Sequence, residues 1–464
     1  MSWGRRAFWS VAALVCGSGA LAVGAVAAVT ERVSISSSGQ QGNDISGRFS
    51  RPDVSADGRF VAFDSQASTL VPRDSNGTTV DVFLRNRRRG KTTLVSVDSL
   101  GRQGNSASQR PVLSANGRFI AFDSNAALVP DDTNQVLDVY VRDRKGRTTT
   151  RVSVAADGAQ ANASSFWPSI SADGRFVAFV SDATNLVPGK TTFVREVYVK
   201  DLQTGAIERV SLADDESESN SDSAIPAISG NGRFVAFASF ATNLVPGDNN
   251  GVFDVFVRDR MLKTTERVSV SSSETEGDAA SQSPSVNGDG RFVAFSSDAT
   301  NLVPMDLNGR RDILVRDRQA GTTERVSVSS SGAEGNSQSD GPGIRGGLSF
   351  GPDISADGRF VTFDSISTNL VPGDTNTCDP FYQDPPGICP DVFVRDRTAG
   401  TTVRASVASD GTQGNRASTD PAISANGLVV TFFSSASNLV PGDTNTCPVF
   451  PAPGSCPDIF VRVS

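Results

Sequence analysis

The stretch PSISADGRFVAF, from Pro168 to Phe179, decides the fold because versions of it recur along the chain. The pattern is P-x-I-S-x-D/N-G-R-F-V-A-F. Its seven copies begin at Pro52, Pro111, Pro168, Pro226, Pro284, Pro352 and Pro421. They follow one another at intervals of about 58 residues, lengthening to about 69 in the last two units, and a fixed period of this size indicates a repeat architecture.

Each unit contains four short segments with β character, separated by turn residues. In the fourth copy these are residues 227–229, 233–237, 254–258 and 264–270, with a Gly-Asn-Gly turn between the first two. The second segment is continuously apolar, which is typical of a buried strand, whereas the fourth (TTERVSV) alternates as an outer strand does. Four antiparallel strands per unit favour radial repetition over a stacked solenoid. We therefore predict an all-β fold, a seven-bladed β-propeller with four-stranded antiparallel blades.

The two ends of the chain fit together in this scheme. The last unit stops at its third strand, residues 458–462, and lacks a fourth. Residues 31–36 (ERVSIS) form an isolated fourth strand that precedes every other part of a repeat and matches residues 266–270. The sequence predicts that this N-terminal strand completes the last blade and closes the ring.

The first residues differ in kind from the repeats. Arg5 and Arg6 precede an uncharged stretch from Ala7 to Val29 that contains the A-x-A sequence Ala25-Val26-Ala27. This pattern is typical of a secretory signal peptide. The alternative is an uncleaved membrane anchor, because the stretch is long enough to span a bilayer. We expect a signal peptide over residues 1–27, a single propeller domain over residues 28–464, and a secreted, periplasmic or cell-envelope location.

Four of the five cysteines support export, and Cys16 lies in the signal segment. Cys378 and Cys389 bracket an insertion in the sixth unit, and Cys447 and Cys456 bracket a matching insertion in the seventh. Three connectivities are open. Local pairs are the economical choice, because the spacing of the cysteines does not suit a zinc site. Disulfides persist in oxidising compartments.

Composition restricts the chemistry available to the protein. The chain has no histidine, which removes the commonest general base and zinc ligand. The net charge is −8, and the one basic run, residues 87–91, lies in a single turn, so we expect no nucleic-acid partner. Most acidic residues stand at repeated positions, where a structural role is the usual one. The sequence accordingly predicts no catalytic residue and a protein that is not an enzyme.

An acidic loop before the third strand raises the question of calcium. Its spacing, D-x-N-(G)-x-x-D, resembles part of a calcium-binding loop, but one carboxylate of the full motif is missing. We favour Asx-turns and expect no cofactor. The residues concerned are Asp74, Asn76, Asp81, Asp132, Asn134, Asp138, Asp248, Asn250, Asp254, Asp306, Asn308 and Asp312.

Aromatic residues that break the repeat mark a candidate partner surface. In an antiparallel blade the loop between the second and third strands lies at the same end as the link to the next blade. Both cysteine insertions and most of the irregular aromatics fall at this end, and aromatics outside a core often mark recognition surfaces. The alternative is that they fill gaps between loops. The predicted partner-binding residues are Phe166, Trp167, Phe381, Tyr382 and Phe450.

The repeat resembles that of the TolB-like, WD-repeat-like β-propeller family. Pro168–Phe179 (PSISADGRFVAF) and Pro352–Phe363 (PDISADGRFVTF) carry the likeness, although another residue replaces the family's second proline. The resemblance covers all seven units and implies the propeller fold, whereas function transfers poorly between members of a fold. The leading hypothesis is a monomeric, exported binding scaffold for a protein or glycan, with membrane contact only through an uncleaved N-terminal segment. The alternatives are a carbohydrate-active lyase or glycosidase, and a calcium-stabilised adhesion module.

Overall fold

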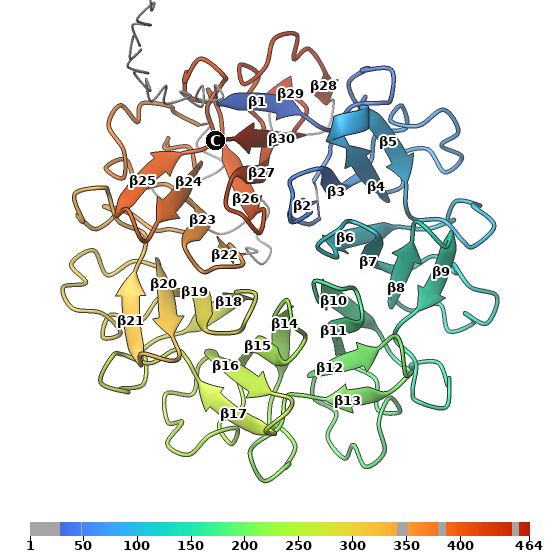
Figure 1. Ribbon diagram of the computed structural model, residues 1–464, viewed down its shortest axis with the longest axis vertical. Helices are drawn as coiled ribbons and strands as arrows, with labels where there is room; N and C mark the ends of the chain where they lie inside the picture. Colours follow the sequence, from blue (N-terminus) through green and yellow to red (C-terminus); the bar gives the residue numbers. More distant parts are fainter. Residues whose placement is uncertain (1–27, 48, 341–350, 379–386, 448–453) are drawn as a thin grey trace, which may run out of the picture.

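The computed structural model describes residues 28–47, 49–340, 351–378, 387–447 and 454–464, which form a ring of seven blades (Figure 1). The one helical element in these residues is the 3-10 turn η1 (Arg87–Arg89), and none of their helices could cross a membrane. Six blades have their four strands in chain order from the axis outward. The predicted seven-bladed, all-β propeller is confirmed.

The first four blades each contain four antiparallel strands, of which the outer one is short; in blade 1 the innermost strand is shorter still. Blade 1 contains β2 (Asp53–Val54), β3 (Phe60–Ser65), β4 (Asp81–Asn86) and β5 (Lys91–Leu94). Blade 2 contains β6 (Ser108–Leu113), β7 (Phe119–Ser124), β8 (Asp138–Asp143) and β9 (Thr148–Arg151). Blade 3 contains β10 (Ser165–Ile170), β11 (Phe176–Ser181), β12 (Glu196–Asp201) and β13 (Ile207–Arg209). Blade 4 contains β14 (Ser223–Ile228), β15 (Phe234–Ser239), β16 (Asp254–Asp259) and β17 (Thr264–Arg267).

The last three blades include the one that joins the chain ends. Blade 5 contains β18 (Ser281–Val286), β19 (Phe292–Ser297), β20 (Asp312–Asp317) and β21 (Thr322–Arg325). Blade 6 contains β22 (Asp353–Ile354), β23 (Phe360–Ser365), β24 (Asp391–Asp396) and β25 (Thr401–Arg404). Blade 7 contains β26 (Ser418–Ile423), β27 (Val429–Ser434), β30 (Asp458–Val463) and β1 (Val29–Arg32), and a small ribbon of β28 (Thr446–Cys447) and β29 (Gly454–Ser455) lies between β27 and β30.

Ring closure by the N-terminus is confirmed. The strand β1 pairs antiparallel with β30, from Val29 opposite Val463 to Arg32 opposite Phe460 (Figure 1). The strand begins earlier and ends earlier than predicted, because after Val33 the chain leaves the sheet and turns toward blade 1. The outer strand of blade 4 is shortened in the same way: β17 ends at Arg267, and Ser269 instead accepts a hydrogen bond from Val255 N at 3.0 Å through its side chain.

The turn between the first two strands explains the repeated S-x-D/N-G-R sequence. In blade 4, Ser229 Oγ accepts a hydrogen bond from Phe234 N at 3.0 Å. Gly232 has φ of 73°, and a Cβ atom there would lie 2.3 Å from the ring of Phe176 in blade 3. Glycine is therefore required both for its backbone conformation and for the close approach of the neighbouring blade. Arg233 then pairs with Asp259 at 2.6 Å, as expected for a turn ion pair.

The hydrophobic core lies between blades. Apolar residues of each blade's second and third strands pack against those of the next blade, as Val180 and Val197 of blade 3 do with Phe237 and Phe256 of blade 4. Phe237 and Phe256 also stack on one another with ring centroids 5.9 Å apart. Because every blade is covered on both faces, the chain has several small cores instead of one large one.

Candidate binding site at the axis of the ring

In five of the seven blades, a non-glycine residue just before the repeated proline has an unusual backbone conformation. In five blades the first strand shifts register at this point, as a β-bulge does. Positive φ is uncommon outside glycine and is an outlier for a β-branched residue. Bulges re-aim side chains and are frequent beside functional sites. The residues, with φ between 52° and 55°, are Arg110, Trp167, Ile225, Ser283 and Asp420.

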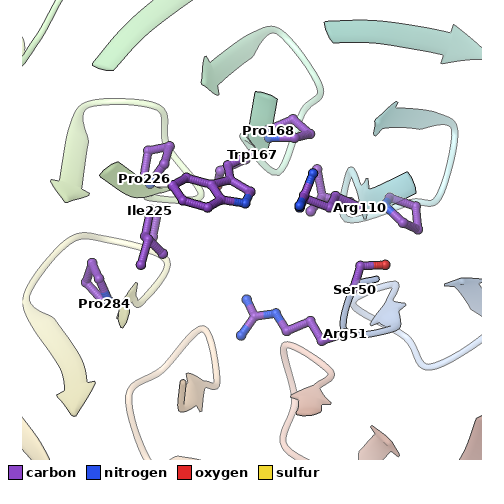
Figure 2. A pocket seen from close by; sticks show the side chains of 12 residues that line it. Ser50, Arg51, Arg110, Trp167, Pro168, Ile225, Pro226 and Pro284 are labelled. Carbon is purple, nitrogen blue, oxygen red and sulfur yellow. The ribbon is translucent and has the colours of Figure 1, made fainter. Parts of the chain in front are cut away.

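Three of these residues line a pocket at the axis of the ring, here called the axial pocket (Figure 2). It lies between the first strands of blades 1 to 5 and has a volume of about 690 Å³ with its open side included. A wall of prolines and small side chains carries few polar groups, which is the usual form of a small-ligand site. The lining residues are Ser50, Arg51, Arg110, Pro111, Val112, Trp167, Pro168, Ser169, Ile225, Pro226, Ala227 and Pro284.

Arg110 forms an ion pair with a buried aspartate and also lines the axial pocket. Its Nη1 lies 3.1 Å from Asp123 Oδ2, and Trp167 N donates to the same oxygen at 3.2 Å. Burial raises the pKa of Asp123, and the Arg110 charge opposes that rise. The guanidinium lies 5.9 Å from the centroid of the Trp167 ring. The Arg110 side chain keeps 24% of its surface exposed, whereas its Nε is buried and has no hydrogen-bond partner among the described residues.

Arg51 supplies a second guanidinium to the pocket from blade 1. It reaches toward blade 6, with Nη2 3.8 Å from Asp353 Oδ1 and Nη1 3.4 Å from Pro352 O. Figure 2 shows Arg51, Arg110 and the Trp167 indole bordering the same space. The adjacent Ser50 donates to Asp64 Oδ1 at 2.5 Å. Because these contacts of Arg51 are long and therefore weak, replacing them with a ligand anion would cost little free energy.

Three carboxyl groups lie together in blades 6 and 7. Burial raises the pKa of Asp364 well above its usual range, and the charges of Asp340 and Asp420 raise it further. Burial likewise raises the pKa of Asp340 to about 6. Asp340 and Asp364 are both buried, and Asp340 N donates to Asp364 O at 2.8 Å. Because burial and the neighbouring charges raise these pKa values, the cluster binds protons more readily than free carboxyl groups do, which is a property that a general acid needs.

The structure places two of the five predicted partner-binding residues. Phe166 and Trp167 lie together in β10, with ring centroids 5.0 Å apart, and Trp167 lines the axial pocket. Phe381, Tyr382 and Phe450 fall outside the described residues, so their membership of one surface stays a prediction. The sequence reasoning missed Arg51 and Arg110. The sign that could have revealed them is the change of residue type before an otherwise repeated proline.

An arginine lies among the carboxylates of the acidic loop in blade 4. Arg267 Nη1 is 3.8 Å from Asp248 Oδ1 and 3.7 Å from Asp254 Oδ2, and it also pairs with Glu276. The carboxylate oxygens lie within 4.8 Å of one another. A guanidinium therefore supplies the positive charge that a Ca²⁺ ion would bring, which favours a structural role for these loops. In blade 5, Arg325 makes the equivalent pairs with Asp306, Asp312 and Glu334.

The cysteines are oxidised where the structure describes them. Cys378 and Cys389 form the predicted local disulfide, with Cα atoms 5.0 Å apart. Cys456 is also disulfide-bonded. In the ribbon of β28 and β29, Cys447 lies opposite Gly454. The pairing of Cys447 with Cys456 stays a prediction.

Comparison with known proteins supports the fold but assigns no family. No family model matches the sequence, and no curated protein matches it. Among solved structures, oligogalacturonate lyase from Vibrio parahaemolyticus is similar with a TM-score of 0.52 at 12% identity, over 94% of this chain and 97% of that one. A puromycin-hydrolyzing peptidase from Mycobacterium tuberculosis gives 0.50 at 15% identity, over 89% of this chain and 53% of that one. A putative TolB from Agrobacterium tumefaciens gives 0.40 at 16% identity, over 69% and 86%.

These comparisons support the β-propeller fold and overturn one expectation. The prediction that the protein is not an enzyme is wrong as an inference from the sequence. A propeller that aligns with 94% of this chain is itself a lyase, so neither the fold nor its repetition argues against activity. The sequence reasoning gave most acidic residues a structural role because they recur. Asp420 does not recur: it stands at the variable bulge position, and its charge raises the pKa of Asp364.

Proposed function

We propose that the protein is an exported, carbohydrate-active propeller that binds an acidic oligosaccharide in the axial pocket and cleaves it as a lyase or glycosidase. The observation that carries the proposal is the juxtaposition of Arg51 and Arg110 with the Trp167 indole. Guanidinium groups match the geometry of carboxylates, and an aromatic face offers an apolar platform for a sugar ring. The proline wall adds apolar surface beside these polar groups.

The carboxyl cluster supports an enzymatic function. Proton transfer to a leaving oxygen or from a sugar carbon needs a group whose pKa is near the working pH. Asp340 and Asp364 have raised pKa values through burial and mutual repulsion. The oligogalacturonate lyase of similar fold is named for an acidic sugar polymer, which makes oligogalacturonate a reasonable first probe. The Cys378–Cys389 disulfide supports a location outside the reducing cytoplasm.

The test compares acidic and neutral sugars on the same protein. Isothermal titration with oligogalacturonate and with a neutral oligosaccharide of equal length should show binding of the acidic one alone, and product analysis should show chain cleavage. Arg110→Ala and Trp167→Ala should each cost about 2 kcal/mol of binding free energy. Arg110→Lys should recover only part of the loss, because lysine lacks the fork of donors.

The matched control is Arg118→Ala, which removes an arginine that pairs with Asp143 in a turn outside the pocket. This variant should bind the acidic sugar as the unaltered protein does. Equal binding of neutral and acidic sugars, or equal losses in Arg110→Ala and Arg118→Ala, would contradict the proposed site. Binding without any product would contradict the enzymatic part alone.

A further inference from the structure

A second basic surface, which shares no residue with the axial pocket, lies in a groove between blades 1 and 2. Its lining includes five cationic side chains and, among the residues that the structure describes, no acidic one. The groove has a volume of about 900 Å³ with its open side included. We call it the basic groove; its cations are Arg89, Lys91, Arg142, Arg144 and Arg147.

The equivalent junction between blades 3 and 4 shows how the repeat normally neutralises its arginines. Arg175 and Arg260 both lie over the ring of Phe176, at 4.7 and 4.4 Å from its centroid. Arg175 pairs with Asp201 at 2.7 Å, and Arg260 Nε donates to Glu208 at 2.6 Å. Each guanidinium therefore has its own carboxylate. The same arrangement surrounds Phe234, with Arg233–Asp259 and Arg318–Glu266, and Phe292, with Arg291–Asp317 and Arg397–Glu324.

At the junction of blades 1 and 2 both carboxylates are replaced. Arg59 and Arg144 lie over Phe60 at 4.7 and 4.3 Å, as in the sister junctions. The strand register, however, puts Asn86 at the position of the aspartate and Thr93 at the position of the glutamate. Asn86 and Thr93 both line the basic groove.

Among the residues that the structure describes, neither arginine forms an ion pair. The buried Nε of Arg59 has no hydrogen-bond partner among the described residues. Burial lowers the pKa of Arg144, and the charge of Arg59 lowers it further, so the two guanidinium groups repel one another. Asp143, next to Arg144 in sequence, pairs with Arg118 at 2.6 Å, and Asp57 accepts a hydrogen bond from the backbone N of Arg59 at 3.0 Å without forming an ion pair with its guanidinium. A partly buried charge without a partner is costly, and a bound anion would relieve that cost.

We propose that the basic groove binds a ligand with several negative charges, of the phosphate- or sulfate-ester class. Arginine forks match the oxygen atoms of such groups, and a single carboxylate would neutralise only one of the clustered cations. Arg89, Lys91 and Arg147 extend the positive surface beyond the Arg59–Phe60–Arg144 stack, so a ligand with more than one charged group fits the groove best. The site shares no residue with the axial pocket and does not depend on the function proposed for it.

The experiment restores the missing glutamate. Thr93→Glu gives Arg144 the partner that Arg260 has in Glu208, so the variant should fold and melt at or above the temperature of the unaltered protein. The control is Thr150→Glu, which adds the same charge at the equivalent position of blade 2, where Leu202 stands in place of an arginine. Isothermal titration would use two probes, inorganic tripolyphosphate and a heparin-derived hexasaccharide, to separate the phosphate and sulfate sources.

The unaltered protein should bind at least one probe, and raising the salt concentration should weaken that binding. Thr93→Glu should reduce the affinity at least tenfold, whereas Thr150→Glu should leave it within twofold. Three results would overturn the proposal: no binding of either probe by the unaltered protein, equal affinity in Thr93→Glu, or an equal loss in both variants, which would indicate net charge without a defined site.

Discussion

Ser34 donates a hydrogen bond of 2.5 Å to Asp458 Oδ1 across 424 residues of sequence. The same hydroxyl accepts a hydrogen bond from Ile459 N at 3.1 Å. Inside blade 5, Ser327 makes the same two contacts with Asp312 and Ile313. The junction of the chain ends thus has the same hydrogen bonds as an ordinary blade, and these bonds help to close the ring.

We predict that removing residues 28–38 leaves β30 as an open edge. The truncated protein should melt at a lower temperature and associate, because an unpaired strand offers free backbone donors and acceptors. Calorimetry and size-exclusion chromatography would measure both effects. Ser34→Ala and Ser327→Ala should each cost about 1 kcal/mol, since each removes the same hydrogen bonds. A truncated protein that stays monomeric and melts normally would contradict closure by the N-terminus.

A second prediction concerns pH. Burial raises the pKa of Asp64 to about 6 and that of Asp458 to about 6. The folded state therefore holds protons that the unfolded chain, with a carboxyl pKa near 3.8, releases. The free energy of unfolding should fall as pH rises from about 4 to 6. Hydrogen bonding to Arg118 lowers the pKa of Asp143 to about 2, so the stability from that pair is lost only in stronger acid.

The melting temperature, measured by calorimetry at constant ionic strength, should thus be highest near pH 4 to 5 and decline toward neutrality. Asp64→Asn should flatten the decline by up to about 1.4 kcal/mol per pH unit, because it removes one titrating group. A melting temperature that rises steadily from pH 5 to pH 7 would contradict this account.

The sequence was sufficient to predict the blades because the repeat supplies the same evidence several times. The Gly232 turn, the Arg233–Asp259 pair and the closing strand all follow from aligned positions. The bulge at Ile225 did not follow. In the fourth unit the first strand was predicted to begin after Pro226, at residue 227, whereas the bulge at Ile225 allows β14 to start at Ser223.

The candidate sites needed contacts that a linear pattern does not contain. Arg267 is in the outer strand of blade 4, and only the fold shows that its guanidinium lies between Asp248 and Asp254. The missing partner of Arg144 is visible only when strand register aligns Thr93 with Glu208. In a repeat protein, a residue that lacks its usual partner can be recognised by comparing its blade with the other blades.

A third prediction separates two roles of glycine. Gly232 and Gly247 have φ of 73° and 75°, but an added Cβ atom would contact Phe176 at the first position and nothing at the second. Gly247→Ala should cost about 1 kcal/mol from backbone strain alone. Gly232→Ala should cost an additional 1–3 kcal/mol or so from overpacking between blades 3 and 4. Chemical denaturation would measure both, and equal costs would show that the blades can separate to accommodate a methyl group.

A fourth prediction is the pairing of the cysteines. Non-reducing peptide mapping should recover Cys447 with Cys456 in one peptide pair and Cys378 with Cys389 in another. The second pair is present in the structure. The strand β28, which contains Cys447, pairs with β29, which ends directly before Cys456. Cross-linked peptides between blades 6 and 7, or free thiols in the exported protein, would contradict local pairing.

The last prediction concerns the acidic loops. In the unaltered protein, Arg267 neutralises Asp248, Asp254 and Glu276, so a chelator should leave the melting temperature unchanged. Arg267→Ala should cost about 3–5 kcal/mol, because it leaves buried carboxylates without a cation. Their oxygens lie within 4.8 Å of one another, a spacing that suits a Ca²⁺ ion, so added calcium should raise the melting temperature of this variant only. The control is Arg233→Ala, which leaves a single carboxylate, Asp259, and should show no response to calcium. A chelator that destabilises the unaltered protein would instead identify calcium as a normal part of the fold.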